Sequence, residues 1–552
     1  MDKILTQIIA QIFPEPLPSL AELEKKYPPR ALPATAMVTR IAPSPTGFIH
    51  LGSLYASLID ERLARQTNGL FILRIEDTDK KREIGGSAEL FVEALTRHGL
   101  IYDEGPVETQ EKGLYGPYKQ SARAKIYHSY IKDLLEKGLA YPCFTSPEEL
   151  EELRAHQETL GERSGYYGRF AIWREKSYED VQAALNQGLK PVIRLKSNGN
   201  FNNKIMVRDL LIGSREMPEN DQDIVIMKTD GLPTYHFAHA VDDHLMRVTH
   251  VIRGNEWFPS LPLHLQLFQI LGWDAPIYSH LAPIQKLDNG NKRKLSKRKD
   301  PEANLAYYHE AGYPEEAIIE YLLNLANSNF EDWRQNNPTT NNQKFEINLK
   351  KLANSSGPLF DAVKLTDISK EIIAKLDADT IYQRTLAWAT QYDPELQTLL
   401  LNNSEYTKDI FNIERTGTDQ PRKDISRWSE IKNEISYFFD DRFQLSPELY
   451  QETIAELKGA EPKKLITDFL DSYKKTDTPE IWFEKLKTVA AQHGFALNAK
   501  EYKLAPEKYH GQVGAVAKLL RLLLTGRLQT PNLCLIMQVM GEERITRRLT
   551  IS

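Results

Sequence analysis

Cysteine is scarce in this sequence, with only Cys143 and Cys534 among 552 residues. So few cysteines exclude a disulfide framework and a zinc site built from several cysteines, and they fit a reducing compartment. No apolar run approaches the length of a membrane-spanning helix, and the N-terminal stretch lacks the cleavage pattern of a secretory signal. We therefore expect a cytoplasmic protein without membrane contact.

An excess of positive charge is also absent, since 70 Lys and Arg residues face 76 Asp and Glu residues and the net charge is −6 at pH 7. A positive field over the whole chain is excluded, so any surface that binds nucleic acid must be local. What the sequence does have is a globular composition, with 41% apolar and 26% charged residues. Its length corresponds to roughly three or four domains.

One stretch near the N-terminus predicts a strand, a loop, a helix and a second strand. Residues 37–42 form a short β-like run, apolar residues recur at helical spacing over residues 51–59, and residues 70–75 are nearly continuously apolar. This order is a βαβ unit, which implies a parallel sheet with ligands at the carboxyl ends of its strands. The loops at residues 43–53 and 76–79 lie at those ends and are candidate ligand-binding loops.

The rest of the chain predicts an insertion in this α/β domain and a helical end. Strand-like runs return at residues 223–227 and 249–254, with a helix from about Tyr235 between them. The polar segment 336–342 predicts a linker, and strand signals nearly vanish after it. We therefore expect an N-terminal extension at residues 1–36 and an α/β domain in two parts, at residues 37–114 and 223–335. An inserted subdomain at residues 115–222 separates these two parts. An all-helical region follows at residues 345–552.

The loop Pro43–Ser53 has the residue types of a phosphate-binding turn. Gly47 and Gly52 permit close backbone approach by a ligand, and free amides at the start of the following helix attract phosphate. His50 adds a hydrogen-bond donor beside them. The alternative is a tight turn in which the histidine only caps the helix, and the loop alone does not separate the two.

Residues Lys292–Lys299 form a second cluster, in which six of eight residues are basic. Such a run is usually a solvated loop or a nonspecific patch for polyanions. If it folds over the loop Pro43–Ser53, however, Lys294 and Lys297 can neutralise the charge that develops on a triphosphate under attack. The two clusters together then predict phosphoryl or nucleotidyl transfer.

A third set consists of Arg40, Glu76, Tyr235 and Arg253, which can reach one crevice outside the predicted sheet. Arg40 ends the first strand, Glu76 follows the second, and Arg253 lies in the strand-like run 249–254. Two arginines and a carboxylate that converge there would bind a small zwitterion with an additional negative group. The alternative is structural ion pairing. His239 lies four residues after Tyr235 and shares its helix face.

Five motifs, taken in order along the chain, resemble those of the glutamyl-tRNA synthetases of bacterial type, which are class I aminoacyl-tRNA synthetases. They are RIAPSPTGFIHLGS (40–53), RIEDTD (74–79), TYHFAHAVDDHLM (234–246), VIRGNEW (251–257) and KLSKR (294–298). The first and last resemble the paired HIGH and KMSKS signatures of class I. The resemblance covers residues 37–330, and the helical tail from residue 511 is also similar.

The resemblance implies both a fold and a reaction. The implied fold is α/β, with a Rossmann-like parallel-sheet catalytic domain, an inserted α+β acceptor-binding subdomain and an all-helical anticodon-binding region. The implied reaction attaches L-glutamate to tRNA through a glutamyl-adenylate and releases AMP and pyrophosphate. The implied partners are L-glutamate, ATP with Mg²⁺, and a glutamate-accepting tRNA, with the glutamine-accepting tRNA left open. We expect a monomer.

Residue by residue, the resemblance also implies roles for the candidate site. The glutamate contacts are Arg40, Ala42, Ser44, Glu76, Tyr235, His239 and Arg253. The ATP contacts are Gly47, His50, Gly52, Ser53, Glu256, Trp257, Lys294 and Lys297. Of these, His50, Lys294 and Lys297 are expected to be catalytic.

The sequence departs from the family pattern at several positions. The loop reads HLGS, without the second histidine of HIGH, and His239 stands where some bacterial relatives have Asn. Thr145 replaces the second cysteine of the zinc-binding variants, so we expect no zinc. Asp242, Asp243 and His244 could suggest another metal, but adjacent carboxylates are more often caps or ion-pair members, and we expect no protein-held metal.

Two rival functions stay open. A glutaminyl-tRNA synthetase shares the sheet and the loop signatures, although PSPTG stands where that family typically has PEPNG. The arginine of VIRGNEW would also have less purpose against a neutral amide. The other rival is a catalytically silent tRNA-binding paralogue, although such a protein would be free to lose His50, Glu76 or Lys297.

Overall fold

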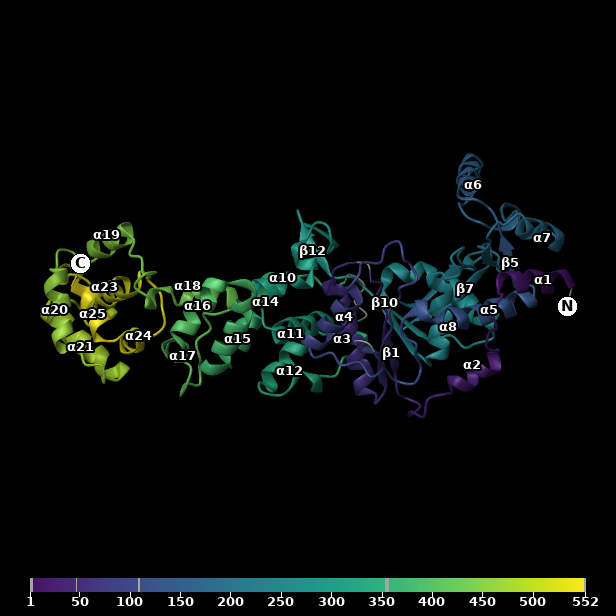
Figure 1. Cartoon of the computed structure of the whole chain (residues 1–552). Coiled ribbons are helices and arrows are strands. Elements are labelled where there is room, and N and C mark those ends of the chain that lie inside the picture. Colours follow the sequence, from purple (N-terminus) through teal and green to yellow (C-terminus); the bar gives the residue numbers. More distant parts are fainter. Residues whose placement is uncertain (1–2, 46, 108–109, 353–356, 551–552) are drawn as a thin grey trace. The chain divides into compact units, whose positions relative to one another are not determined.

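The computed structural model describes residues 3–45, 47–107, 110–352 and 357–550. The chain divides into two compact units (Figure 1). Unit 1 comprises Met1–Tyr307 and Ile319–Asp361, and unit 2 comprises Tyr308–Ile318 and Ala362–Ser552. Within the described residues, no helix has both the length and the apolar composition that a bilayer crossing requires.

Two pairs of parallel strands form the centre of unit 1, as the predicted parallel sheet requires. Strand β1 (Val38–Ile41) pairs with β2 (Leu70–Leu73), and β10 (His250–Gly254) pairs with β11 (Ile277–Leu281). The two pairs meet where Thr249 donates its backbone N–H to the Val38 carbonyl at 3.0 Å. Within each pair the two strands run the same way, so their carboxyl ends lie at the same edge.

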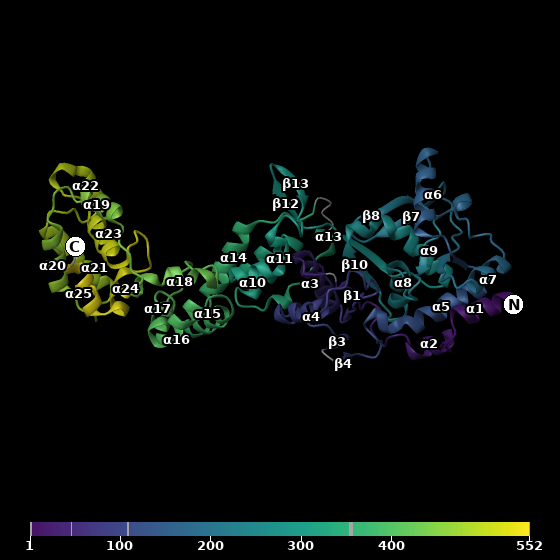
Figure 2. The same cartoon turned by 45° about the horizontal axis from the view of Figure 1, so that its top comes forward.

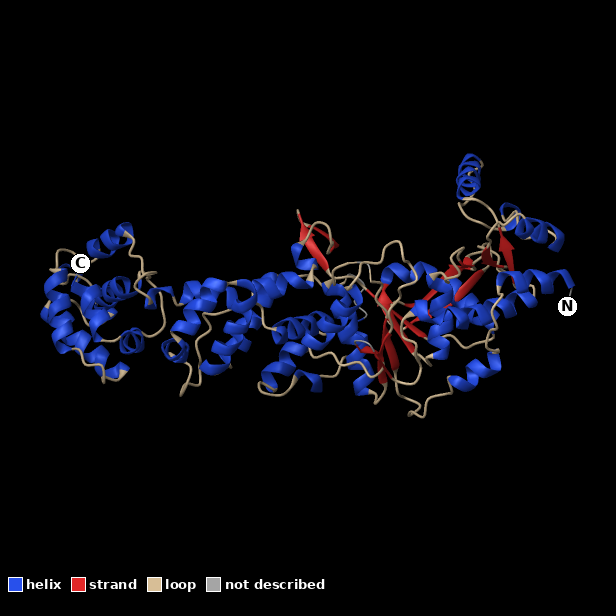
Figure 3. Cartoon of the chain, viewed as in Figure 1, coloured by secondary structure: helices blue, strands red, loops and turns tan. Residues whose placement is uncertain are grey.

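Helices cover this sheet because the sequence places apolar residues toward it. Helix α3 (Leu51–Gln66) packs on β1 and β2, and its apolar residues Leu51, Leu54 and Leu58 are wholly buried, as the helical spacing predicts. Helices α8 (Tyr235–Leu245) and α9 (Leu261–Leu271) contribute to the main core of the unit with α5 (Ala124–Glu136). Figure 3 shows the strands of this unit surrounded by helices.

The strand pairing of the inserted region does not follow the predicted boundary at residue 222. Strands β5 (Ala140–Cys143), β6 (Val192–Leu195) and β9 (Val225–Met227) form one antiparallel sheet. Strand β7 (Lys204–Asp209) forms a hairpin with β8 (Gly213–Pro218) and also pairs with β11. Thus β9 belongs with the insertion and β7 extends the catalytic sheet, because a short apolar run does not reveal its pairing partner.

Unit 1 contains further short elements around this frame. Two hairpins are formed by β3 (Gly105–Val107) with β4 (Gln110–Lys112) and by β12 (Gln285–Asp288) with β13 (Asn291–Lys294). The remaining helices of the unit are α4 (Ser87–Arg97), α6 (Pro147–Thr159), α7 (Tyr178–Asn186), α12 (Phe330–Asn336) and α13 (Leu349–Leu352). The division between the units falls within α10 (Leu305–Ala311) and α11 (Glu315–Ala326).

The N-terminal extension is an integral part of unit 1. Helix α1 (Lys3–Ile12) lies beside α5 and α7, as Figure 2 also shows, and α2 (Leu20–Lys26) packs on α5. Leu5, Ile9 and Tyr27 are buried in the same core as α8. The extension therefore packs into the core of unit 1.

Unit 2 is helical, as predicted, with no strand among its described residues. Its start differs from the predicted residue 345, because residues 345–361 belong to unit 1. Phe345 and Ile347 are buried, and the Phe360 N–H donates to the Gln285 carbonyl of β12 at 2.7 Å. The helices are α14 (Ala362–Ala374), α15 (Ala378–Tyr392), α16 (Pro394–Asn402), α17 (Ser404–Asn412), α18 (Ile431–Glu434), α19 (Pro447–Ala455), α20 (Pro462–Ser472), α21 (Pro479–Gln492), α22 (Ala499–Leu504), α23 (Val513–Thr525), α24 (Leu533–Met540) and α25 (Glu542–Thr550).

Candidate functional site

A cleft of about 1430 Å³ opens in unit 1 at the carboxyl ends of β1, β2 and β10. Most of the residues that the sequence singles out line it, although they come from five separate stretches of the chain. Those residues are Arg40, Ala42, Ser44, His50, Gly52, Ser53, Glu76, Tyr235, Arg253, Glu256, Trp257, Lys294 and Lys297. Gly47 and His239 are absent from the lining of this cleft.

The start of helix α3 forms one end of the cleft. His50 caps this helix, because the Gly52 backbone N–H donates to its Nδ1 at 2.8 Å. Since Nδ1 accepts this bond, the proton of the neutral ring sits on Nε2, which is then a donor. Burial lowers the pKa of His50, and the nearby Lys297 lowers it further. The capping role and the donor role are therefore compatible.

Gly52 and Gly47 serve the loop in different ways. A Cβ at Gly52 would lie 3.0 Å from the His50 Nδ1, so the cap requires a small residue there. Gly47 has a φ of +129°, a conformation that L side chains rarely adopt. Thr46, between the two ends of this loop, lies outside the described residues.

The lysine-rich segment folds against this loop. Lys297 donates through Nζ to the Phe48 carbonyl at 3.2 Å, and the same Nζ lies 4.9 Å from the centre of the Phe48 ring. Lys294 Nζ lies 3.6 Å from a carboxylate oxygen of Glu256. The segment is anchored by Leu295, which is 1% exposed and bonds to the Ile284 carbonyl. Two lysines thus face the start of α3.

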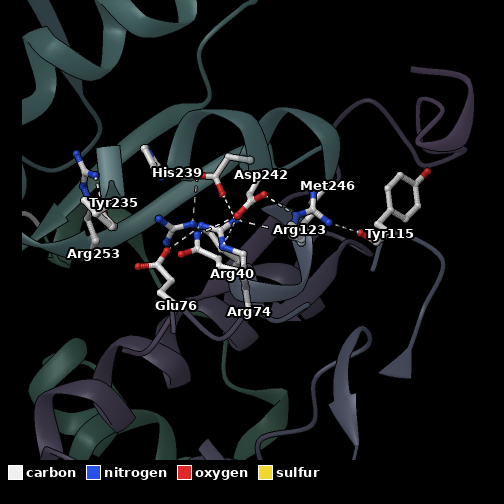
Figure 4. Close-up of polar contacts among 12 residues, drawn as sticks. Arg40, Arg74, Glu76, Tyr115, Arg123, Tyr235, His239, Asp242, Met246 and Arg253 are labelled. Atoms are coloured by element: carbon white, nitrogen blue, oxygen red, sulfur yellow. Dashed lines mark hydrogen bonds and ion pairs between the residues drawn. The ribbon is translucent and has the colours of Figure 1, made fainter. Parts of the chain in front are cut away.

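At the other end of the cleft, Arg253 projects from the end of β10. Its Nη1 donates to the Tyr235 hydroxyl at 3.2 Å, and the two residues lie together in Figure 4. Its Nε donates to His280 Nε2 and its Nη2 to His264 Nδ1, both at 3.0 Å. No sequence pattern marks these two histidines, because they lie on separate elements outside every motif.

Beside Arg253, a buried group of charges surrounds Arg40. Arg74 donates to Asp243 at 2.5 Å and to Glu76 at 3.2 Å, and Arg40 Nε lies 3.4 Å from Asp243. Figure 4 shows Arg40, Arg74 and Glu76 gathered beneath helix α8. Burial raises the pKa of Glu76. Against the effect of burial, Arg74 and Arg40 hold the pKa of Asp243 well below its usual range.

The adjacent carboxylates of α8 are ion-pair members, as predicted. Asp243 pairs with Arg74, and Asp242 accepts from Arg123 Nε at 2.6 Å and from the Tyr127 hydroxyl at 2.8 Å. Among the described residues, no group of three or more His, Cys, Asp or Glu side chains could hold a metal ion. The sequence marks Arg74 only as the first residue of RIEDTD and gives no sign of Arg123, because the α8 carboxylates that pair with them are more than 100 residues away.

His239 lies one layer beneath the cleft rather than in its wall. It is wholly buried, its ring stacks on Tyr235 with centres 5.8 Å apart, and its Nε2 bonds to the Tyr278 hydroxyl at 2.9 Å. Burial lowers its pKa to about 3. In the described cleft, His239 therefore supports Tyr235 from behind.

Comparison with known proteins gives consistent matches. The family model described as tRNA synthetases class I (E and Q), catalytic domain, matches residues 36–365, and the anticodon binding domain matches residues 380–552. A glutamate–tRNA ligase of Clostridium perfringens strain 13 is 48% identical over 526 residues, which cover 95% of this chain and 96% of the relative. One of Sorangium cellulosum is 43% identical over 556 residues, covering 96% of each chain.

Solved structures agree with these sequence matches. The crystal structure of a glutamate tRNA ligase from Elizabethkingia meningosepticum, in complex with its amino acid, has a TM-score of 0.74 to this chain at 29% identity. The match covers 93% of this chain and 98% of that one.

Proposed function

This chain belongs to the class I tRNA synthetases for glutamate and glutamine, and from its site we propose how it acts as a glutamate–tRNA ligase. It attaches L-glutamate to tRNA in two steps and consumes ATP, supplied as its magnesium complex. The observation that carries the proposal is that one cleft contains two features. The start of helix α3, with Lys294 and Lys297 beside it, lies at one end, and the buried Arg253, which has no carboxylate partner among the described residues, lies at the other.

The first step joins the amino acid to the nucleotide. The glutamate α-carboxylate attacks the α-phosphorus of ATP, an O–P bond forms, and the bond to the β-phosphate breaks to release pyrophosphate. His50 Nε2, Lys294 and Lys297 stabilise the negative charge on the phosphates, because fixed positive groups and donors favour the transition state. Gly47, Gly52 and Ser53 shape the phosphate-binding loop, and Glu256 and Trp257 contact the adenosine.

Recognition of glutamate occurs at the opposite end. Arg253, Arg40 and Tyr235 bind the side-chain carboxylate, Glu76 binds the amino group, and Ala42 and Ser44 contact the α-carboxylate. His239 acts by holding Tyr235 in place, since it is covered by that ring. In the second step the 2′-hydroxyl of the terminal tRNA adenosine attacks the glutamyl carbonyl carbon, and AMP leaves.

The other parts of the chain serve tRNA binding. The insertion near residues 115–222 contacts the acceptor end, and the helical region contacts the anticodon, which its family match supports. We further propose that the enzyme is a monomer in the compartment where translation takes place. A glutaminyl enzyme fits less well, because a buried guanidinium without a carboxylate partner favours an anionic ligand over a neutral amide.

The decisive test is aminoacylation of purified glutamate and glutamine tRNAs with each amino acid and ATP. We expect glutamate to be charged, and K297A to slow adenylate formation at least 100-fold in single turnover without weakening tRNA binding. Lys299 is exposed and outside the cleft lining, so K299A serves as the matched control. Charging of glutamine alone, or an unchanged rate in K297A, would contradict the proposal.

A further inference from the structure

Arg253 differs from the other buried arginines of the site in the partners that hold it. Arg74, Arg40 and Arg123 each lie beside a buried carboxylate, at 2.5, 3.4 and 2.6 Å respectively. Arg253 is also buried, with 6% of its surface exposed, yet among the described residues its hydrogen-bond partners are all uncharged acceptors. Its positive charge is therefore not cancelled by direct contact with a protein carboxylate.

The protonation of the two histidines follows from their bond to Arg253. Arginine only donates, so His280 Nε2 and His264 Nδ1 must both accept. The proton of His280 is then on Nδ1, which lies 2.6 Å from Asp209 Oδ2. Burial lowers the pKa of His280 and holds that of His264 well below its usual range, so both rings are neutral near pH 7.

Asp209 fixes His280 from the end of β7. Its Oδ1 accepts the backbone N–H groups of Leu211 and Ile212, each at 2.9 Å, and its Oδ2 accepts the backbone N–H of His280 at 3.1 Å. With the His280 ring, four donors hold this carboxylate. Its charge lies one imidazole ring away from Arg253, so it orients the histidine without pairing with the guanidinium.

The remaining geometry leaves part of Arg253 for a ligand. Three of the five N–H groups of a guanidinium are taken by Tyr235, His264 and His280. The Tyr278 ring lies 5.0 Å from the guanidinium carbon and adds an uncharged contact. Two N–H groups are left, which is the number that a carboxylate accepts in a bidentate pair.

We propose that His264, His280 and Asp209 are positioning residues that make the site select an acidic amino acid over its neutral amide, because they hold Arg253 through uncharged acceptors. This inference rests on the proposed glutamate–tRNA ligase function. A carboxylate in the place of either histidine would cancel the charge of Arg253 before the substrate arrives. The site would then lose its preference for glutamate while the nucleotide end of the cleft stayed intact.

The test uses two variants of nearly equal size in the full-length enzyme. H264N keeps an uncharged acceptor near the position of Nδ1, whereas H264D adds a negative charge there. Affinities for the sulfamoyl analogues of glutamyl-adenylate and glutaminyl-adenylate are measured by calorimetry, with ATP affinity as the readout of folding. We expect H264D to reduce the preference for the glutamyl analogue at least 30-fold, H264N to reduce it less than fivefold, and ATP affinity to change less than twofold.

A second pair guards against a variant that does not fold. H280Q and H280E are compared in the same way. D209N should lower the affinity for the glutamyl analogue about tenfold in the native background. It should not lower this affinity in H280Q, where the imidazole is gone. His250 lies on the opposite face of β10 from Arg253, so H250Q is the control. Equal losses for Asn and Asp, or for Gln and Glu, would overturn the charge argument. A native enzyme that binds neither analogue would instead overturn the proposed function.

Discussion

At the residue scale, burial decides the protonation of the histidines around the cleft. It lowers the pKa of His236 to about 4 and that of His239 to about 3, whereas an exposed histidine titrates near pH 6.5. Between these values the unfolded chain binds protons that the folded chain excludes. Folding stability must therefore fall as the pH decreases through this window.

This sign leads to a prediction for His239, which is wholly buried. As the pH falls from 7 to 5, protonation of His239 in the unfolded chain alone should lower the free energy of unfolding by about 2 kcal/mol. H239N should lose about 2 kcal/mol less over the same interval, because asparagine does not titrate there. Urea unfolding of the full chain at the two pH values measures both losses. Identical pH dependence in the two proteins would show that His239 is not the titrating group.

Individual site residues were predictable only where a motif or a strand end marked them. Arg40, Glu76 and Arg253 follow predicted strands, and the structure places them in one cleft, although their roles stay predictions. His264, His280 and Asp209 carry no such mark, because their importance arises from contacts between α9, β11 and β7. A bond between side chains that are distant along the chain leaves no trace in spacing or periodicity.

At the element scale, the N-terminal extension ties together parts of unit 1 that border the site. Arg30 forms a bidentate pair with Glu104 at 2.7 and 2.8 Å, and its Nε donates to the Met246 carbonyl just after α8 at 3.0 Å. The Tyr27 hydroxyl donates to the Gly116 carbonyl, at the start of the inserted region. Helix α8, which carries Tyr235 and Asp243, is thus anchored at its far end by this segment.

We expect R30M to destabilise the enzyme by about 3 to 5 kcal/mol, because it leaves the Glu104 carboxylate buried without its cation. The side chains of this pair are only 7% and 11% exposed. The matched control is K125M, which removes a pair with Glu15 whose side chains are 62% and 69% exposed. That change should have little effect on the free energy of unfolding, because water and salt screen an exposed ion pair. Similar losses for the two variants in urea unfolding would refute a structural role for the buried pair.

Helices and strands whose apolar residues recur at a regular spacing were predicted well. The strands with which they pair were not. The helix that begins at residue 51 follows from the spacing of its apolar residues over residues 51–59. Strand β9 was also expected, but its pairing with β6 was not, since three apolar residues suit either sheet. Register and pairing depend on which surfaces the insertion buries, and this information is spread over the whole unit.

At the scale of the whole molecule, the boundary between the units matters for the cleft. The polar segment 336–342 suggests a linker, yet the chain returns to unit 1 after it. Phe345 packs on Phe330 with ring centres 5.0 Å apart, and Gln285 of β12 exchanges backbone hydrogen bonds with Pro358 and Phe360 at 2.8 and 2.7 Å. Strand β12 is half of the hairpin that presents Lys294, so this return segment supports the nucleotide end of the site.

Two truncations should therefore behave differently. A chain ending at residue 361 keeps the return segment, and we expect it to bind the glutamyl-adenylate analogue within about tenfold of the full enzyme while losing tight tRNA binding. A chain ending at residue 344 lacks the support of β12 and should bind the analogue at least 100-fold more weakly. Both truncated chains lack residues 362–552, with which residues 308–318 form unit 2. Any loss of affinity from this cause is therefore the same in the two fragments. Calorimetry with both fragments measures the difference, and equal affinities would mean that residues 345–361 do not hold the lysine-bearing hairpin in place.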